Sequence, residues 1–410
     1  MRKWLFLFIS MLIGASSLLA CKPTPTPTGL YPTITPGQTQ ATATGVSPKG
    51  ETPQATQTAV AYPTGPLTLT VSDILDLSFI NTNQGWLLGS GCETALGNCH
   101  RWPILLRITS DGGQNWSSLP APLAFSSYSL PPTETLRISR VLFCSETDGW
   151  LYGPSAFSTN DGGHTWTKAQ SDILALALTS DTLWAIQASA DGVWSVSTST
   201  DHGRTWLKPT NQPQWLGSVP QLVALNKQQA WVLANDEFTW YLWKTTDGGA
   251  TWVELPNTAA PYRAARVLLV TPDGKLWLFS ADQPTTAIQS KALYSSSDGG
   301  TTWQVVATPP FDSQTPCKLP SLGHLSTAKQ VAAASSGSLF IALGRYTLLR
   351  SQNAGCDWAE AIPVQQANLG DATISSVTFV DNLHGWAPAP PNRLFITADG
   401  GLTWQMVAIP

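Results

Sequence analysis

Residues 245–252 read TTDGGATW, and closely similar octapeptides recur along the chain. They are TSDGGQNW at 109–116, TNDGGHTW at 159–166, STDHGRTW at 199–206, SSDGGTTW at 296–303, SQNAGCDW at 351–358 and TADGGLTW at 397–404. The final Trp residues of successive copies stand 40 to 55 residues apart. One fixed turn recurring at this period predicts an array of similar supersecondary units, and four-stranded blades fit the length.

The residue types of the octapeptide are those of a tight turn. The Asp side chain can accept hydrogen bonds from backbone N–H groups further along the turn, and the Gly two positions later supplies a positive φ. The Trp five positions after the Asp is expected to pack over the hairpin. We therefore interpret the acidic positions as structural: Asp111, Asp161, Asp201, Asp247, Asp298, Asn353 in the sixth copy and Asp399. Asn forms the same side-chain turn, so we expect the sixth hairpin to be intact.

A second motif precedes each turn, and it places a Trp in an apolar strand after a polar turn. Clear examples are LDLSFINTNQGWLLG with Trp86, RVLFCSETDGWLYG with Trp150 and SVTFVDNLHGWAP with Trp386. Each repeat thus reads as four short strands, two of them carrying a Trp. The sequence predicts an all-β fold, a seven-bladed β-propeller of four-stranded antiparallel blades.

The octapeptide resembles the Asp-box, or bacterial neuraminidase repeat, of sialidases, some xyloglucan-degrading enzymes and sortilin-type receptors. Its pairing with a Gly-Trp strand in nearly every repeat looks most like the photosystem II stability/assembly factor family. The resemblance covers residues 70–410 and implies an extracytoplasmic seven-bladed propeller, which in many cyanobacteria is a lipoprotein. These motifs are scaffold residues, so they specify the fold and not the function.

The N-terminal segment has the order of a bacterial secretory signal. Arg2 and Lys3 precede an apolar run from Trp4 to Ala20. The sequence Leu-Leu-Ala-Cys ending at Cys21 resembles a lipobox, which implies cleavage before Cys21 and acylation of its thiol. An uncleaved membrane anchor is the alternative, and either one places the rest of the chain outside the cytoplasm of a bacterium.

The next segment is rich in Pro and Thr. Residues 22–66 hold 9 Pro and 12 Thr among 45 residues, a composition that cannot bury enough apolar surface to fold. We expect an extended, disordered tether. The predicted domains are a lipoprotein signal peptide (1–20), the tether (21–66) and the propeller (67–410).

Composition and motifs exclude several classes of function. Charged residues make up 12% of the chain and the formal net charge is −4, which argues against a nucleic-acid-binding protein. The sequence has no His-Glu-x-x-His, phosphate loop or Gly-x-Ser-x-Gly, and it has no Phe-Arg-Ile-Pro segment of a sialidase. We predict a non-catalytic protein with no metal and no cofactor.

Recognition residues are expected on the face opposite the Asp turns, where the longer connections lie. Arg and aromatic side chains in such loops on a rigid scaffold often form binding sites. The candidates in these loops are Arg101, Trp102, Arg137, Trp215, Tyr262 and Arg263, and the inner strands add Arg140 and Arg266. Arg140 and Arg266 belong to a set of positions at the heads of the inner strands, with Asp76, Leu174, Gln221, Lys329 or Gln330, and Ser376. This set either forms a binding ring or lines a solvated pore.

Five Cys residues follow Cys21. Cys92 and Cys99 flank one short loop, and in an oxidising compartment we expect a disulfide between them. Cys317 and Cys356 either pair or lie on opposite faces of the sixth repeat. Cys144 falls in an inner strand, where a buried thiol is expected.

The function predicted from these features is that of a membrane-tethered, extracytoplasmic scaffold that binds a protein partner, comparable to an assembly factor. The alternative is a carbohydrate-binding or glycosidase-like (sialidase-type) surface protein, for which a glycan would be the ligand. A cluster of Trp102, Trp215 and Tyr262 would favour the alternative. A shallow face that brings Arg137, Arg140, Arg263 and Arg266 near one another would favour protein binding.

Overall fold

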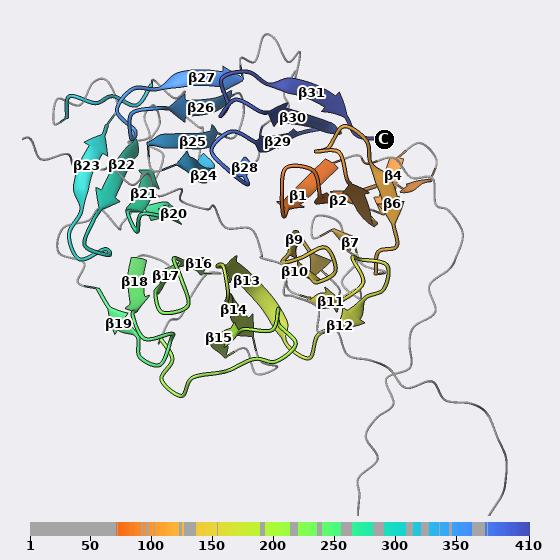
Figure 1. Cartoon of the computed structure of the whole chain (residues 1–410), viewed down its shortest axis with the longest axis horizontal. Coiled ribbons are helices and arrows are strands. Elements are labelled where there is room, and N and C mark those ends of the chain that lie inside the picture. The colour runs from red at the N-terminus through yellow and green to blue at the C-terminus, as the bar shows by residue number, and fades with distance from the viewer. Residues whose placement is uncertain are drawn as a thin grey trace, which may run out of the picture.

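The computed structural model is a ring of seven antiparallel blades, which confirms the fold predicted from the repeats (Figure 1). Within each blade the strands follow chain order from the inner to the outer edge. The described residues are 71, 73–91, 93–95, 98–101, 103–122, 125–126, 137–153, 155–188, 193–213, 220–235, 240–255, 265–281, 291–308, 315–320, 328–335, 337–343, 347–362, 374 and 376–410.

The first four blades use the strands up to β19. Blade 1 consists of β1 (Asp73–Phe79), β2 (Gly85–Ser90), β5 (Ile104–Thr109) and β6 (Ser117–Leu119). Blade 2 consists of β9 (Arg140–Phe143), β10 (Gly149–Tyr152), β11 (Phe157–Thr159) and β12 (Thr167–Lys168). Blade 3 consists of β13 (Asp172–Leu178), β14 (Leu183–Ala188) and β15 (Trp194–Ser199). Blade 4 consists of β16 (Gln221–Ala224), β17 (Ala230–Asn235), β18 (Trp240–Thr245) and β19 (Val253–Glu254).

The remaining strands form three more blades and two small additions. Blade 5 consists of β20 (Ala265–Val270), β21 (Leu276–Ala281), β22 (Lys291–Ser296) and β23 (Gln304–Ala307). Blade 6 consists of β24 (Ala328–Ser335), β25 (Ser338–Leu343), β26 (Thr347–Ser351) and β27 (Ala359–Ile362). Blade 7 consists of β28 (Thr378–Phe379), β29 (Gly385–Ala389), β30 (Arg393–Thr397) and β31 (Gln405–Ala408). Two pairs lie in connections, β3 (Glu93–Ala95) with β4 (Asn98–Arg101) and β7 (Phe125–Ser126) with β8 (Arg137–Ile138).

The fourth strand of blade 3 is reduced to a single bridge. Leu207 exchanges backbone hydrogen bonds with Thr198 of β15. Further along this edge, the side-chain amide of Gln212 accepts the N–H of Val196 at 2.7 Å and donates to its carbonyl at 3.1 Å. The Gln212 side chain therefore satisfies the strand edge at a position where the other blades have backbone.

The Asp turns are held by their own side chains. In the fifth copy, Ser296 Oγ donates to Asp298 Oδ1 and accepts the N–H of Gly300, both at 2.8 Å. Asp298 accepts the N–H of Thr302 at 2.9 Å and its hydroxyl at 2.6 Å. The Thr302 hydroxyl, and after it the Thr302 N–H, lowers the pKa of Asp298 from 3.8 to about 2. The pKa is also lowered to about 2 at Asp111, Asp161, Asp201 and Asp399.

Acid is expected to destabilise the ring through these turns. Because the folded-state pKa of about 2 lies below the unfolded value of 3.8, each such carboxylate stabilises the folded protein at neutral pH. This contribution is complete above the unfolded pKa and is lost as the pH falls through the folded pKa. We expect the urea concentration at the midpoint of unfolding to decrease as the pH is lowered from about 4 to about 2.

The substitution Asp298→Asn isolates one turn, because Asn keeps the turn but does not titrate. The difference in urea midpoint between the native chain and this variant should be largest at neutral pH and should shrink toward pH 2. A difference that stays constant with pH would show that ionisation of this turn does not contribute to stability.

The Gly residue in the Gly-Trp strands lies against an aromatic ring, which leaves no room for a side chain. Phe143 lies over Gly149 so closely that a Cβ there would stand 2.5 Å from the ring. The same Phe143 ring stacks on Trp86 of the preceding blade, with centroids 3.7 Å apart. Phe79 lies in the same way over Gly85, and Phe379 over Gly385. The spacing of Phe, Gly and Trp in these repeats therefore encodes contact between neighbouring blades.

Indole N–H groups also connect successive blades. Each donates to the carbonyl of the residue that follows the turn Asp, or its equivalent, in the next blade. The bonds are Trp86 to Gly162 (3.0 Å), Trp150 to His202 (3.0 Å), Trp231 to Gly299 (2.9 Å) and Trp386 to Gly112 (2.8 Å). The N–H groups of Gly112 and Gly162 bond to the first turn of their own blade, so the first turn and the Asp turn of a blade share a face.

The bond from Trp386 closes the ring between the two ends of the described chain. Blade 7 holds only C-terminal strands and blade 1 only N-terminal strands, so these two sheets exchange no strand. Phe79 stacks on Trp386 with centroids 3.6 Å apart, and buried Val71 and Ile409 belong to the same apolar cluster. Among the described residues, closure therefore involves side-chain packing and the indole hydrogen bond from Trp386 to Gly112.

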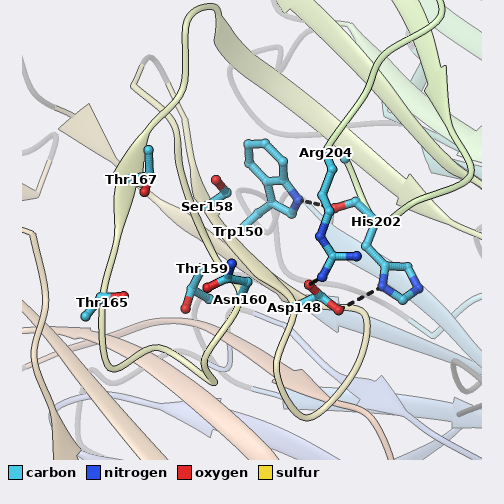
Figure 2. Close-up of a pocket in the computed structure, with 10 residues that line it drawn as sticks. Asp148, Trp150, Ser158, Thr159, Asn160, Thr165, Thr167, His202 and Arg204 are labelled. Carbon is cyan, nitrogen blue, oxygen red and sulfur yellow. Dashed lines mark hydrogen bonds and ion pairs between the residues drawn. The ribbon is translucent and has the colours of Figure 1, made fainter. Parts of the chain in front are cut away.

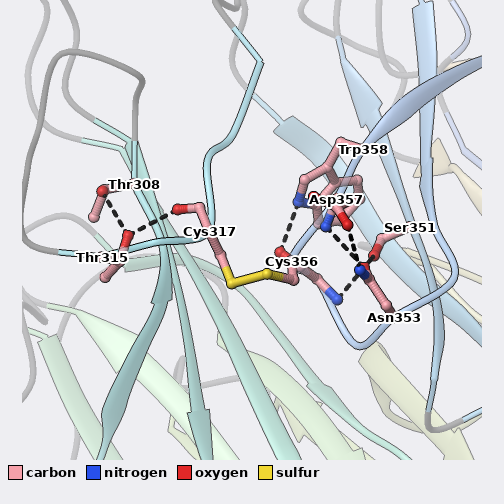
Figure 3. The surroundings of a disulfide bond; sticks show 9 residues. Thr308, Thr315, Cys317, Ser351, Asn353, Cys356, Asp357 and Trp358 are labelled. Atoms are coloured by element: carbon pink, nitrogen blue, oxygen red, sulfur yellow. Dashed lines mark hydrogen bonds between the residues drawn. A yellow bond between two sulfur atoms is a disulfide. The ribbon is translucent and has the colours of Figure 1, made fainter.

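Cys317 and Cys356 form a disulfide, which decides between the two alternatives for this pair (Figure 3). Cys356 lies in the sixth turn, where Asn353 accepts the N–H of Asp357 at 2.7 Å and donates to its carboxylate at 2.6 Å. The connection after β23 bonds to the edge of blade 5 through Thr308, and it then reaches the turn of blade 6. Cys144 is buried, as expected.

Candidate functional site

The predicted binding residues fall in several parts of the ring. Trp102, Trp215, Tyr262 and Arg263 lie outside the described residues, as do Cys92, Cys21 and the segment 1–66. The backbones of Arg101, Arg137 and Arg266 lie in β4, β8 and β20, and Cys99 lies in β4. Arg137 and Arg140 belong to the region of blade 2, whereas Arg266 belongs to blade 5, with two blades between them. Of these binding candidates, Arg140 is the one whose side chain is described.

Arg140 contacts Asp76 across the boundary of blades 1 and 2. Its Nη1 lies 3.5 Å from Asp76 Oδ1, and the side chain of Arg140 is 55% exposed against 14% for Asp76. Asp76 Oδ2 also accepts the N–H of Val141 at 3.0 Å. A register shift in β1 between Ile74 and Asp76 accompanies this placement. We call Asp76, Arg140 and the adjacent Tyr152 the inner-strand cluster.

Burial sets the acid–base properties of the inner-strand cluster. Desolvation raises the pKa of Asp76, although the charge of Arg140 acts in the opposite direction. Desolvation also raises the pKa of Tyr152, and the Asp76 charge adds to that effect. The cluster thus presents one exposed guanidinium that a largely buried carboxylate holds in place.

Side chains at the inner-strand heads also connect neighbouring blades. Gln221 Oε1 accepts the N–H of Leu268 in the next blade at 2.9 Å, in the same manner as Asp76 with Val141. The expected polar positions at Asp76 and Gln221 therefore have a structural role between inner strands. Arg140 differs from both because most of its side chain faces solvent.

A second cluster lies at the other end of β9 and β10, on the Asp-turn face. Asp148 is buried, and its carboxylate accepts hydrogen bonds from the hydroxyls of Ser145 and Thr147. It also contacts two side chains of the third Asp turn, His202 Nδ1 at 3.0 Å and Arg204 Nη2 at 2.5 Å (Figure 2). Four partners thus hold this one carboxylate between blades 2 and 3.

His202 has a backbone conformation that favours glycine. Its φ is 60°, and the equivalent positions in the other six turns are Gly112, Gly162, Gly248, Gly299, Ala354 and Gly400. A side chain in the left-handed region costs about 1–2 kcal/mol. The carbonyl of His202 accepts the indole N–H of Trp150. The hydrogen bonds of its ring and its carbonyl hold His202 in this conformation.

An open cleft adjoins the Asp148 cluster, and we call it the blade 2–3 cleft. Its inner part has a volume of about 150 Å³, with Thr165 and Thr167 on the side opposite Arg204 (Figure 2). Its outer part, of about 490 Å³, continues past Gln187 and Trp206. The cleft is lined by hydroxyl, amide and charged groups from blades 2 and 3.

The sequence analysis did not predict the blade 2–3 cleft, because His202 and Arg204 lie inside an octapeptide that was interpreted as a structural turn. The available signal was the departure of the third turn, DHGR, from the repeated DGG pattern. Asp148 carries no comparable signal, since only the fold brings it to the next blade's turn. Among the described residues, no group of three His, Cys, Asp or Glu side chains could hold a metal ion. The described part of the chain also contains no helix long and apolar enough to span a membrane.

No protein-family model matches the chain. Three curated proteins match parts of it, two of them described as Xyloglucanase Xgh74A. Xyloglucanase Xgh74A of Acetivibrio thermocellus is 24% identical over 253 residues, which are 51% of this chain and 28% of that protein. Photosystem II assembly lipoprotein Ycf48 of Synechococcus sp. is 28% identical over 148 residues, or 33% of this chain and 37% of that protein. The aligned segments thus span less than two fifths of either relative.

Solved structures match the fold over most of the propeller. The structure described as YCF48 bound to D1 peptide has a TM-score of 0.55 and 20% identity, covering 80% of this chain and 94% of that one. YCF48 from Cyanidioschyzon merolae has a TM-score of 0.53 and 15% identity, covering 80% and 96%. At these identities the likeness supports the propeller fold.

Proposed function

We propose that this chain is a membrane-tethered, extracytoplasmic scaffold that binds an extended segment of a partner protein without catalysing a reaction. The observation that carries the proposal is the exposed guanidinium of Arg140 on an inner strand, held by Asp76. Arginine is enriched among the residues that dominate binding energy at protein interfaces. An Arg already fixed in position loses little conformational freedom when it binds a carboxylate or carbonyl.

Two comparisons support a protein partner. One solved relative of the same fold was determined with a peptide bound, and one curated relative is described as an assembly lipoprotein. The lipobox-like sequence ending at Cys21 supports the tether. The disulfide between Cys317 and Cys356 supports an oxidising compartment, because such bonds are rare in the cytoplasm.

The proposal is tested with short peptides taken from extracytoplasmic segments of the host's membrane proteins. We expect a subset to bind the full-length chain, and Arg140→Ala should weaken that binding at least tenfold, about 1.4 kcal/mol. Arg140→Lys should restore part of the peptide affinity, because Lys carries the positive charge but lacks the planar guanidinium group. Isothermal titration calorimetry measures the affinities, and thermal melting checks that each variant is folded.

The matched control is Lys227→Ala, which removes an exposed cation from the Asp-turn side of blade 4. Peptide affinity should not change in this variant. Equal losses in Arg140→Ala and Lys227→Ala would reduce the interaction to general charge attraction. Absence of any bound peptide would contradict the proposal.

The second candidate is a carbohydrate-binding or glycosidase-like surface protein, and the partial match to a xyloglucanase favours it. In that case oligosaccharides would bind at the face of the longer connections, and Trp215→Ala would abolish the binding. That result, together with no effect of Arg140→Ala on any peptide, would replace the first proposal by the second.

A further inference from the structure

The seven repeats provide an internal comparison, and four features that each occur in one repeat meet at the boundary of blades 2 and 3. The place of Asp148 is taken in the other blades by Gln84, Thr182, Gln229, Lys275, Ser338 and His384. The place of Arg204 is taken by Gln114, His164, Ala250, Thr301, Cys356 and Leu402. His202 replaces the usual Gly, and blade 3 has its fourth strand reduced to a bridge. Each departure lies at or beside the blade 2–3 cleft.

The polar groups of the cleft are held in place before any ligand binds. Asp148 fixes the guanidinium of Arg204, whose side chain is still 57% exposed. Gln187 Oε1 accepts the hydroxyl of Ser197 at 2.8 Å, which fixes the plane of its amide. Thr165 Oγ1 donates to Asp161 at 2.6 Å and keeps its lone pairs as acceptors. Preorganised donors and acceptors of this kind favour binding because little ordering remains to be done.

The charges of the cleft nearly cancel. The guanidinium of Arg204 is compensated by the carboxylate of Asp148. Lys168, which lines the outer part, interacts electrostatically with Asp172. A phosphate or a carboxylate-rich ligand would therefore find no uncompensated positive charge here. The lining suits a neutral ligand that both donates and accepts hydrogen bonds.

The blade 2–3 cleft also contains an aromatic side chain, that of Trp206. Trp206 is partly exposed at its outer part and packs edge-on against Trp150, with centroids 5.9 Å apart. An indole offers an apolar surface to the C–H groups of a ligand, while neighbouring hydroxyls and amides bond its polar groups. The outer volume of about 490 Å³ lies in the range of small-molecule sites, about 300–1,000 Å³.

We propose that the blade 2–3 cleft is a binding site for a neutral saccharide. Arg204 and Gln187 donate hydrogen bonds to sugar hydroxyls, the hydroxyls of Thr165 and Thr167 accept them, and Trp206 packs against the sugar ring. The cleft begins on the Asp-turn face and runs along the boundary of blades 2 and 3 to Gln187, which pairs with Ile173 near the start of β13. Arg140 does not line the cleft, so this site is separate from the proposed peptide site. It also differs from a glycan site at Trp215.

The test titrates the full-length chain with glucose, galactose, xylose, cellotetraose and mannotriose, and separately with inorganic phosphate. We expect at least one neutral sugar to bind with a Kd of about 1 mM or lower. Calorimetry and NMR of the Trp indole signals measure the binding. Arg204→Met keeps the length of the side chain without its donors, and Thr167→Val removes one hydroxyl at equal volume. Arg204→Met should weaken binding about tenfold or more, and Thr167→Val severalfold.

The matched control is Gln114→Ala, at the equivalent place in the first turn, which should leave sugar affinity unchanged. Three results would overturn the proposal. They are the absence of binding by every sugar up to about 10 mM, sugar binding that both cleft variants retain, and binding of phosphate in preference to the sugars. Sugar binding that is lost in Trp215→Ala and retained in Arg204→Met would place the saccharide on the other face.

Discussion

Replacement of Trp386 by alanine is expected to lower the free energy of unfolding by about 3–5 kcal/mol. Trp386 is 1% exposed, stacks on Phe79 and donates to Gly112, so it carries much of the contact between the first and last blades. Because blades 1 and 7 share no strand, this loss acts where the ring is closed. Urea unfolding measures the change, and hydrogen exchange should accelerate first in blades 1 and 7.

A pair of Phe variants separates the hydrogen bond from the packing. Trp386→Phe keeps a stacked ring but leaves the Gly112 carbonyl without its indole donor, at a cost of about 1–3 kcal/mol. Trp184 occupies the same place in blade 3, is fully buried, and has no hydrogen-bond acceptor for its Nε1 among the described residues. Trp184→Phe should therefore cost less than Trp386→Phe. Equal costs would show that the indole bond does not help to close the ring.

Removal of the disulfide by the double substitution Cys317→Ser and Cys356→Ser is expected to cost roughly 4 kcal/mol of stability. The bond joins residues 39 apart in sequence, and a loop of that length gains considerable chain entropy in the unfolded state when it is opened. The bond also holds the connection after β23 against blade 6, where Leu319 is buried. Thermal and urea unfolding of the native and doubly substituted chains under oxidising conditions measure the difference.

The matched control is the double substitution Cys92→Ser and Cys99→Ser. Their predicted bond would close a much shorter loop, so its loss should cost less, about 2 kcal/mol. A reducing agent added to the native chain should lower stability by more than either double substitution alone. If the Cys317 and Cys356 substitutions leave stability unchanged, the link contributes nothing to the folded ring.

Most of the fold could be predicted because the repeat encodes local geometry. Asp298, Gly300 and Trp303 lie within one octapeptide, so their turn forms from neighbouring residues alone. The Gly-Trp motif is readable for a similar reason, since Phe143 covers Gly149 from the adjacent strand. Seven such units of known strand content leave a closed ring of blades as the arrangement that buries their apolar faces.

The candidate sites were less predictable because they depend on contacts between repeats. Arg140 was predicted at the head of an inner strand, but its contact with Asp76 of the preceding blade depends on how the two blades pack. Asp148 was not selected, because nothing near it in sequence indicates that His202 and Arg204 lie beside it. The pairing of Cys317 with Cys356 was left open, since it depends on the path of the connection after β23.

The number of blades, the turns and the residues that pack between strands could all be predicted from the repeats. They depend on hydrogen bonds and ring contacts among residues close in the chain or repeated at a fixed period. Closure of the ring through Trp386 and Gly112, and the contacts of charged groups across blades, are visible in the folded ring alone. Side chains far apart in sequence interact only after the blades have packed around a common axis.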